Sequence, residues 1–471
     1  EKILISTPVV EDEGEFLEIT IDETNSLLLN PNKPVLPYYE KTFSYPAGTI
    51  IESIDVELKE NVKTDIGKKI IPAPQPQIAS MAHIKQIETV SEELTEPYPE
   101  KNFDYSIGRG IEDGKPTTFV KVSVYPVKYL PEDKQISSFN EFEIKVKINK
   151  PKKPVETGNN YNLLILSPGK YTSNLNSLVT HKNSIGISTK LVVLDEIYNE
   201  IYFPTEGRDD IEEIKYFIKN AYDSWGIKNV LIVGGIEDFP ARKTHIKVSD
   251  DDQEIFVSDL YYADLYDGSN NFLTWDSNEN DVFAEKNWEG NNDEIDFYPD
   301  VRIGRLACTT SGEVETSVQK IINYETSEAW TKNWFNNIVV IGGDTIPASY
   351  GDESGIDEGE LVNQEILDVM EGFVPNRIWD SNNRLSSFSP SGVKNINDGI
   401  NNGCGFLDWS GHGAPWVWTT FPHNGNRQSL PTPTGSYKNN DILNLINGEK
   451  LPIAVNGGCS LGKYQSDDDC F

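Results

Sequence analysis

Apolar and polar residues alternate along the first 150 positions, with the period of strands that bury one face. Turn-forming Pro, Gly and Asn residues separate the alternating segments. The clearest segments are FLEITI (Phe16 to Ile21), IIESIDVELKE (Ile50 to Glu60), TFVKVSVYPVKYL (Thr118 to Leu130) and EFEIKVKI (Glu141 to Ile148). The pattern predicts an all-β, sandwich-like domain over residues 1–150. Residues 151–160 are polar and rich in Pro and Lys, which is typical of an exposed linker that is open to cleavage.

After residue 160 the period changes. Short apolar runs such as YNLLILSP, KNVLIVGG and NNIVVIGGD read as buried strands, and segments such as Glu206 to Gly226 have apolar residues at helical spacing. This alternation predicts an α/β fold, with a mainly parallel sheet flanked by helices on both faces. We expect two similar subdomains, residues 161–330 and 331–471. An irregular acidic insertion occupies about residues 250 to 300 of the first.

Composition and charge narrow the possible functions. The chain has 471 residues, 37% of them hydrophobic, which is enough for several cores. No apolar run reaches the roughly 18 to 20 residues that a membrane span requires. The formal net charge of −34 argues against nucleic-acid and anionic membrane surfaces as partners, because both would be repelled. Such a charge suits a secreted or cell-surface protein, a salt-tolerant protein or a calcium binder.

The cysteines exclude two kinds of site. Cys308, Cys404, Cys459 and Cys470 include no CxxC pair and no metal-ligand spacing. A dense disulfide scaffold is therefore excluded, although one bridge is not.

Two predicted strands end abruptly in glycines that flank a reactive side chain. GFLDWSGHG leads to His412, and LPIAVNGGC leads to Cys459, 47 residues later. One strand, helix, strand unit between them would place the two strand ends side by side at the working edge of a parallel sheet. The pair predicts Cys459 as nucleophile and His412 as its base, with the N–H groups of Gly413 and Cys459 as the oxyanion site. Without the glycines and the histidine, a cysteine at a strand end is ordinarily a small buried hydrophobic residue.

These residues resemble a known family. SGHG with the following APWVW, and LPIAVNGGC, are similar to the histidine loop and the cysteine strand of caspase-like cysteine peptidases, and within them of the gingipain family. VLIVGGIEDFPAR (Val230 to Arg242) and DVRIGRLACTT (Asp300 to Thr310) resemble two earlier strands of that family. The resemblance extends from about Tyr161 to the end. The β-rich region is similar to the family's propeptide, above all at Ser106 to Pro131.

The resemblance implies a secreted cysteine endopeptidase made as a zymogen, with His412 as general base and acid and Cys459 as nucleophile. The N-terminal domain would keep it latent, and cleavage would follow basic residues, Arg or Lys. Its partners would be protein or peptide substrates and its own propeptide domain. The family continues with a helix and further strands, so we expect subdomain 331–471 to be incomplete at its C-terminal end and to continue, in the same chain or in a second one.

The resemblance also implies roles for acidic and aromatic residues. Asp344 falls where the family has an acid near the catalytic histidine. Glu360 falls nearest the acid of the specificity pocket, with Asp357 and Glu358 as rivals because the preceding loop is longer here. Acids that open a helix are, however, usually solvated caps. Trp416 and Trp418, in the histidine loop, are expected to bind substrate.

An acidic pocket would accept a basic residue of the propeptide. Arg109 is the only arginine before the linker and stands between glycines in SIGRGIEDG, which indicates a flexible tip that enters the cleft. Turn-favouring sequence alone would also explain these glycines. Lys150, Lys152 and Lys153 in and beside the linker are competing candidates.

The acidic insertion has the spacing of a calcium loop. In WDSNENDVFAE, Asp276, Asn278 and Asn280 stand at alternate positions with Glu285 beyond them. Asp264, Asp267 and Asp296 are candidates to complete the shell. Uncompensated carboxylates would repel one another, which favours a structural calcium ion over a solvated loop.

Two other functions fit the same residues. One is a non-catalytic, calcium-stabilised adhesion or binding protein on a caspase-like scaffold. The other is a transamidase that passes the thioester to an amine. The presence of both His412 and Cys459 argues against the first.

Overall fold

The computed structural model describes residues 1–73, 94–151, 160–204, 206–249, 252–346, 356–423, 429–466 and 470–471. The chain divides into two compact units. The first unit joins the N-terminal β-rich region to the first α/β subdomain and ends at Leu306, and the second contains Ser173–His181 and Ala307–Phe471. Helix α5 (Ser311–Thr326) belongs with the second of these contact-defined units. The expected linker lies mostly outside the described residues.

The described residues of the N-terminal region form three sheets, with strand orders β1-β11-β10 joined by β6, β2-β3-β7, and β4-β5-β9-β8. Alternate side chains such as Val120, Val122 and Val124 of β9 form its core with Phe142 and Ile144 of β11. The described residues of 1–150 contain no helix, in agreement with the sequence pattern. The strands are β1 (Lys2–Leu4), β2 (Val9–Glu13), β3 (Phe16–Thr20), β4 (Ser26–Leu28), β5 (Leu36–Pro46), β6 (Ile50–Asp65), β7 (Lys69–Ile70), β8 (Phe103–Glu112), β9 (Lys115–Val124), β10 (Val127–Leu130) and β11 (Gln135–Asn149).

The first α/β subdomain has a parallel sheet with the order β13-β12-β14-β19. Helix α3 begins after Asp209, whose side chain accepts from the Glu212 N–H, and ends at Gly226 in the left-handed conformation. Its apolar face packs on the sheet through Ile214 and Phe217. The elements are β12 (Leu163–Ser167), η1 (Gly169–Tyr171), α1 (Thr172–Ser184), β13 (Thr189–Val193), α2 (Leu194–Tyr198), α3 (Asp210–Trp225), β14 (Asn229–Val233) and β19 (Arg302–Leu306).

The acidic insertion is more regular than expected. It forms a small sheet with the order β16-β15-β17-β18. Strands β15 and β16 of this sheet form an antiparallel hairpin. The acidic composition of this segment favours an irregular loop. The alternation of side chains on either side of the hairpin turn instead corresponds to two strands. The elements are β15 (Arg242–Ser249), β16 (Asp252–Ser258), α4 (Leu260–Ala263), β17 (Glu285–Trp288) and β18 (Asn291–Asn292).

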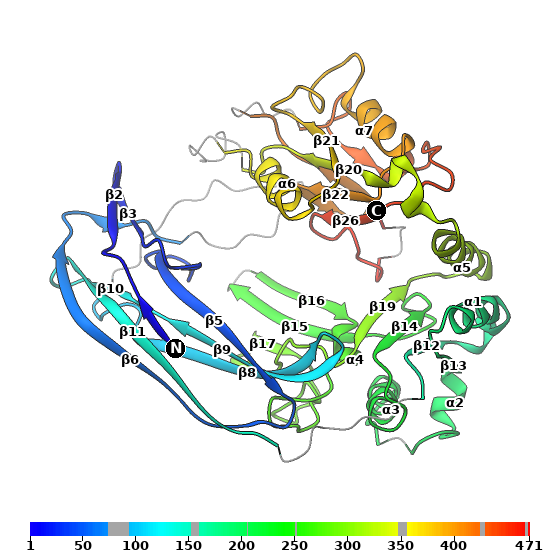
Figure 1. Ribbon diagram of the computed structural model, residues 1–471, viewed down its shortest axis with the longest axis horizontal. Helices are drawn as coiled ribbons and strands as arrows, with labels where there is room; N and C mark the ends of the chain where they lie inside the picture. The colour runs from blue at the N-terminus through cyan, green and yellow to red at the C-terminus, as the bar shows by residue number, and fades with distance from the viewer. Residues whose placement is uncertain are drawn as a thin grey trace. The chain divides into compact units, whose positions relative to one another are not determined.

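The second α/β subdomain has a parallel sheet with the order β21-β20-β22-β26. Figure 1 shows helices α6 and α7 on opposite faces of this sheet, as right-handed crossovers on either side of β20 require. Val339, Ile341, Ile378, Leu407 and Trp409 contribute to the core. The elements after α5 are η2 (Ala329–Thr331), η3 (Asn333–Asn336), β20 (Asn337–Gly342), α6 (Glu358–Val369), β21 (Val374–Trp379), α7 (Gly392–Asn401), β22 (Phe406–Ser410), β23 (His412–Ala414), β24 (Val417–Thr419), β25 (Tyr437–Lys438), α8 (Asn439–Ile442) and β26 (Ile453–Gly457).

The two parallel sheets share one topology. In each, the first strand of the subdomain lies between the second and the third, and the fourth strand lies beyond the third. The predicted α/β class and the two similar subdomains are therefore confirmed.

Candidate active site

The carboxyl ends of three neighbouring strands meet at one edge of the second subdomain. β20 leads into Gly343 and Asp344, β22 leads into His412, and β26 leads into Cys459. Strand β22 pairs with both of the others, with Ser410 opposite Gly342 on one side and opposite Gly457 on the other. The topology thus brings the predicted histidine and cysteine loops together at the sheet edge where ligands bind in open α/β folds.

Glycines permit a close approach between these loops. A Cβ atom on Gly413 would lie 2.6 Å from the Cys459 carbonyl oxygen, and one on Gly458 would lie 3.1 Å from the Gly413 nitrogen. A larger residue at either position would push the loops apart. The side chain of Cys459 is exposed, as a nucleophile that meets a substrate must be.

A backbone carbonyl orients the His412 ring. The Nε2 atom lies 2.7 Å from the carbonyl oxygen of Thr345. Because a carbonyl oxygen only accepts, Nε2 carries the proton, and in a neutral imidazole this leaves the lone pair on Nδ1. The ring also lies edge-on to Phe421, with 5.6 Å between the ring centroids.

Asp344 was expected to orient the imidazole, but the contact described above comes from the next residue, Thr345. The Asp344 carboxylate accepts from the Ile346 N–H at 2.9 Å, and its backbone pairs with Phe421. Glu358 in turn accepts from the N–H of Thr345 at 3.0 Å and from its hydroxyl at 2.8 Å. Glu358, expected as a rival specificity acid, therefore fixes the loop whose carbonyl contacts the histidine.

The other two candidate specificity acids both have partners. Glu360 is buried and accepts from the Ser381 N–H at 2.9 Å and from its hydroxyl. Burial raises the pKa of Glu360, and the contacts with Ser381 lower it in part. Asp357 lies 3.0 Å from Nδ1 of His423, and this contact raises the pKa of the histidine.

The two tryptophans of the histidine loop have different environments. Trp416 is 51% exposed and remains available to a substrate. Trp418 is 0% exposed and packs against Trp409, with 5.2 Å between the ring centroids. The expectation that Trp418 binds substrate is therefore wrong, because Trp418 lies in β24, whose three residues are all buried, whereas Trp416 precedes this strand.

A buried polar network beneath the site was not predicted. The Asn363 amide donates to Asp408 at 2.6 Å and to the Ser410 hydroxyl at 3.1 Å, and accepts from the Trp379 indole. Burial raises the pKa of Asp408. The network links α6, β21 and β22 directly below His412. The one signal for it in the sequence was the pair of polar residues inside the apolar run FLDWS.

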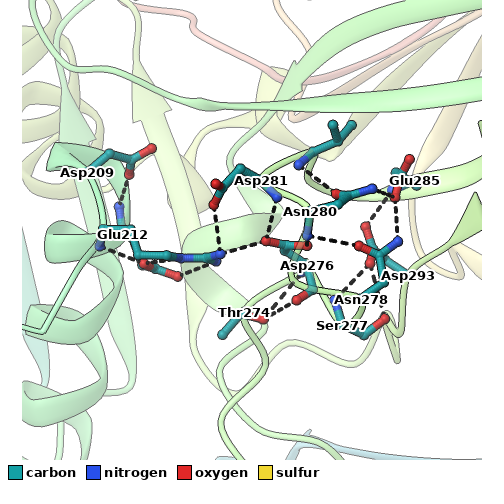
Figure 2. A network of polar contacts seen from close by, with 12 residues as sticks. Asp209, Glu212, Thr274, Asp276, Ser277, Asn278, Asn280, Asp281, Glu285 and Asp293 are labelled. Atoms are coloured by element: carbon teal, nitrogen blue, oxygen red, sulfur yellow. Dashed lines mark hydrogen bonds and ion pairs between the residues drawn. The ribbon is translucent and has the colours of Figure 1, made fainter.

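Four of the predicted calcium ligands come together in one loop, shown in Figure 2. The amides of Asn278 and Asn280 donate to Glu285 at 2.8 and 2.9 Å. Their carbonyl oxygens accept from backbone N–H groups of the loop itself. Arg208 donates to Asp276 at 2.6 Å. These contacts compensate both buried carboxylates, so repulsion between them does not by itself require a cation.

The remaining predicted ligands lie in other networks. Asp267 closes its own turn by accepting from the N–H groups of Ser269 and Asn271. Asp264 is buried and accepts from the Trp275 indole at 2.7 Å. Among the described residues, no group of three carboxylates that includes the predicted ligands is close enough to share one ion. The donor types suit calcium, and the ion itself stays a prediction.

Arg109 does not lie in a flexible tip. It belongs to β8 and pairs with Thr118 of β9, within the first unit. Its side chain is 2% exposed, and the guanidinium lies 3.2 Å from the Tyr222 hydroxyl and 3.5 Å from Asp300. The prediction of a mobile tip is therefore wrong, because the flanking glycines serve close packing rather than a turn.

Cys308 and Cys404 are buried, as expected, and Cys459 is exposed. Within the described ranges, no helix combines the length and the apolar character that a membrane crossing needs. Lys152 and Lys153 of the linker lie outside the described residues, as do the acidic residues 467–469.

The match to a family model defines the class of protein. The model of Peptidase family C25 matches residues 156–471. Because the match covers well over half of the chain, the protein belongs to this family. The match covers the α/β region, whose two parallel sheets agree with the α/β fold that the resemblance implied, and the β-rich region before residue 156 lies outside it.

Its relatives include gingipains of Porphyromonas gingivalis. Gingipain R2 is 23% identical over 323 residues, which are 68% of this chain and 34% of the relative. Gingipain R1 is 22% identical over 68% of this chain and 26% of its own length. The chain thus spans about a third or less of the length of these curated relatives.

Two solved structures are also similar. One is the Arg-specific cysteine proteinase gingipain R (RgpB), with 21% identity, a TM-score of 0.44, and coverage of 68% of this chain and 59% of that one. The other is the complex of the P. gingivalis RgpB pro- and mature domains, with 20% identity, a TM-score of 0.43, and coverage of 66% and 58%.

Proposed function

We propose that this chain is the zymogen form of a secreted cysteine endopeptidase. Cys459 is the nucleophile, His412 takes its proton and later protonates the leaving amine, and the N–H groups of Gly413 and Cys459 stabilise the oxyanion. The observation that supports this most is the approach of the two glycine-bracketed loops at the ends of β22 and β26, where Gly413 meets the Cys459 backbone. Family membership supports the same reaction class.

Cleavage after Arg or Lys is the preference that we propose. The support is the set of carboxylates near the start of α6, of which Glu360 is buried and fixed by Ser381. A buried carboxylate that is already fixed in one orientation is a suitable partner for a guanidinium or an ammonium. Cleavage after arginine also agrees with the description of one similar structure, gingipain R (RgpB), as an Arg-specific cysteine proteinase.

Latency is proposed to come from the N-terminal β region. Its support is the likeness to gingipain propeptides and the compact unit that it forms with the first α/β subdomain. Secretion is proposed with it, since the net charge of −34 suits an extracellular protein.

One labelling experiment tests the reaction class. An acyloxymethyl ketone with Lys or Arg next to the reactive group should label the protein after the linker is cut, and Cys459→Ala should abolish the label. Cys470→Ala is the matched control and should keep it. A label that persists in the Cys459→Ala variant would overturn the assignment. Complete lack of labelling would favour the adhesion or binding scaffold. An amide product formed with an added amine would favour the transamidase.

We also propose calcium as a structural ion of the loop Asp276 to Glu285. The support is its donor set of two buried carboxylates and two carboxamides within one short segment. No step of the proposed hydrolysis passes through the ion. Calcium should raise the melting midpoint, and Glu285→Gln should remove this response, whereas magnesium should have less effect. A midpoint that is indifferent to calcium would mean that Arg208 and the amides provide all of the compensation.

A further inference from the structure

Strand β8 of the N-terminal region docks on the insertion of the first α/β subdomain. Its Gly108 forms an antiparallel bridge with Asp267, and the Ile111 N–H donates to the Pro299 carbonyl at 3.2 Å. The Arg109 N–H between them donates to Asp296 at 2.8 Å. The backbone of β8 therefore forms hydrogen bonds with residues 267 to 299 of the insertion, which are distant in the sequence.

The glycines on either side of Arg109 are needed for this contact. A Cβ atom on Gly108 would lie 2.2 Å from Cδ2 of Tyr298, and one on Gly110 would lie 3.0 Å from the Pro299 carbonyl oxygen. Neither glycine has the positive φ that would require glycine for conformational reasons. The Gly-Arg-Gly sequence is therefore explained by the surface that it packs against.

The Arg109 side chain enters a pocket built for a guanidinium. Its terminal nitrogen donates to the Tyr222 hydroxyl at 3.2 Å, and its Cζ atom lies 4.4 Å from the centre of the Tyr266 ring. Its Nε atom lies 3.5 Å from Oδ1 of Asp300. Ring faces and a carboxylate are the surroundings that a buried guanidinium requires.

The pocket in turn depends on the arginine. Asp300 is 0% exposed, and its Oδ2 atom accepts from the N–H groups of Leu265 and Tyr266 at 2.9 Å each. Its Oδ1 atom has no hydrogen-bond partner in the part of the chain that the structure describes, and Arg109 forms an ion pair with it. Burial raises the pKa of Asp300 to about 7, and Arg109 is the strongest influence that lowers it. Removal of the arginine would leave a buried carboxylate without its counter-ion.

We propose that Tyr222, Tyr266, Asp296 and Asp300 form an arginine-binding site through which the first α/β subdomain retains the N-terminal domain after the linker is cut. The ligand that the site fits is an arginine in an extended strand between two glycines. The site belongs to the first compact unit and the His412 and Cys459 loops belong to the second, so retention of the domain can be measured apart from inhibition of the dyad. The proposal deepens the zymogen function proposed above, because it names the surface that holds the inhibitory domain.

The test uses the full chain with Cys459→Ala, so that no peptidase activity is involved. The recognition sequence of a site-specific protease replaces residues 152–159, and the chain is cut there. The dissociation constant of the two fragments is then measured by dilution and size-exclusion chromatography. Arg109→Ala should raise the dissociation constant about 100-fold or more, as expected for loss of one partner of a buried ion pair. Arg109→Lys should also weaken retention about 10-fold, because an ammonium cannot make the planar contacts of a guanidinium.

Two controls keep the result specific. Lys101→Ala removes a charge from an exposed pair with Asp104 and should leave retention unchanged within about twofold. Gly108→Ala should weaken retention through its contact with Tyr298, whereas Gly67→Ala, which has open space around it, should not. The comparison of Gly108→Ala with Gly67→Ala gives a second measurement of retention if Arg109→Ala does not fold.

Equal retention of the Arg109→Ala and Gly108→Ala fragments with the parent would overturn the proposal. Because the assay detects association alone, its outcome is independent of whether Cys459 hydrolyses peptides. Failure of the ketone labelling together with arginine-dependent retention would reject the peptidase and leave the arginine site in place.

Discussion

The two α/β subdomains have the same strand order and differ at the carboxyl ends of their strands. In the first, Arg305 of β19 closes this edge: it donates to both oxygens of Asp259 at 2.7 Å and to the carbonyls of Gly234 and Phe239. In the second, the corresponding edge has glycines that expose Cys459 beside the histidine loop. One topology therefore supports a closed, ion-paired edge in one copy and, in the other, an open edge at which Cys459 is exposed.

The difference shows that the same strand order can place either a structural ion pair or exposed side chains at the carboxyl ends of the strands. The residues at those ends determine which of the two is present. In the first subdomain Arg305 is buried and paired with Asp259, so its removal should affect stability. In the second the reactive residues lie at an accessible edge, so their removal should affect chemistry and leave stability nearly unchanged. The following predictions separate these two effects.

The largest effect is expected at the open edge. His412→Ala should lower kcat/KM on a Lys or Arg peptide substrate about 10⁴-fold, because Cys459 loses its base. The melting midpoint should stay close to that of the parent. His181→Gln, on α1 and paired with Glu325, is the control and should keep full activity. Comparable losses in both variants would contradict the assignment of the base.

The closed edge should respond in stability. Arg305→Ala leaves Asp259 and two carbonyl groups without their donor and should lower the free energy of unfolding by about 3 to 5 kcal/mol. Urea unfolding measures this change. Arg302→Ala, an exposed residue of the same strand, should change it by less than about 0.5 kcal/mol. If Arg305→Ala were as stable as Arg302→Ala, the closed edge would have no structural role.

A buried lysine in the first subdomain predicts a pH dependence. Lys215 is fully buried, its Nζ atom lies 4.2 Å from the centre of the Tyr261 ring, and burial lowers its pKa to about 7 from 10.5. Between these values the unfolded chain binds more protons than the folded chain, so stability rises with pH.

The measurement is the difference in unfolding free energy between the parent and Lys215→Met at several pH values. From pH 7 to pH 10 this difference should shift in favour of the parent by roughly 3 kcal/mol, at about 1.4 kcal/mol per unit of pKa shift. A difference that stays constant over this range would show that Lys215 keeps its ordinary pKa.

The smallest effect is expected at the loop that orients the histidine. Glu358→Gln weakens the two bonds that fix Thr345 and should lower kcat about 10-fold with little change in KM, because the imidazole loses its fixed orientation. The pH profile of kcat should shift as well. Glu365→Gln, exposed on the same helix, is the control. A change confined to KM would instead place Glu358 in substrate binding.

Much of the fold followed from local pattern. The alternation in residues 16–21 and 141–148 predicted strands β3 and β11, and the apolar runs near 230 and 338 predicted β14 and β20. The hairpin of β15 and β16 has no clear pattern of apolar and polar residues in sequence, because exposed and buried positions both include charged residues, such as exposed Lys243 and buried Arg242. The assignment of α5 to the second compact unit depends on tertiary contacts, which have no local pattern in the sequence.

The site was predictable in its reactive residues and less so in their partners. His412 and Cys459 were recognisable because glycines and an apolar strand precede each of them. The Thr345 carbonyl was not, since a backbone atom has no signature in sequence. Trp418 resembles Trp416 in sequence, and only the packing of β24 against Trp409 and the core of the second unit separates the buried residue from the exposed one.

The sequence alone determined the α/β class, the β-rich N-terminal region and the identity of the two residues at the ends of β22 and β26, because periodicity and glycine placement act over short distances along the chain. Tertiary structure alone decided which carboxylates have partners: Asp276 with Arg208, Glu358 with Thr345, and Asp300 with Arg109. The physical reason is that burial and counter-ions depend on residues brought together from distant segments. The pKa of a charged side chain, and its effect on stability, are set only when those neighbours are in place.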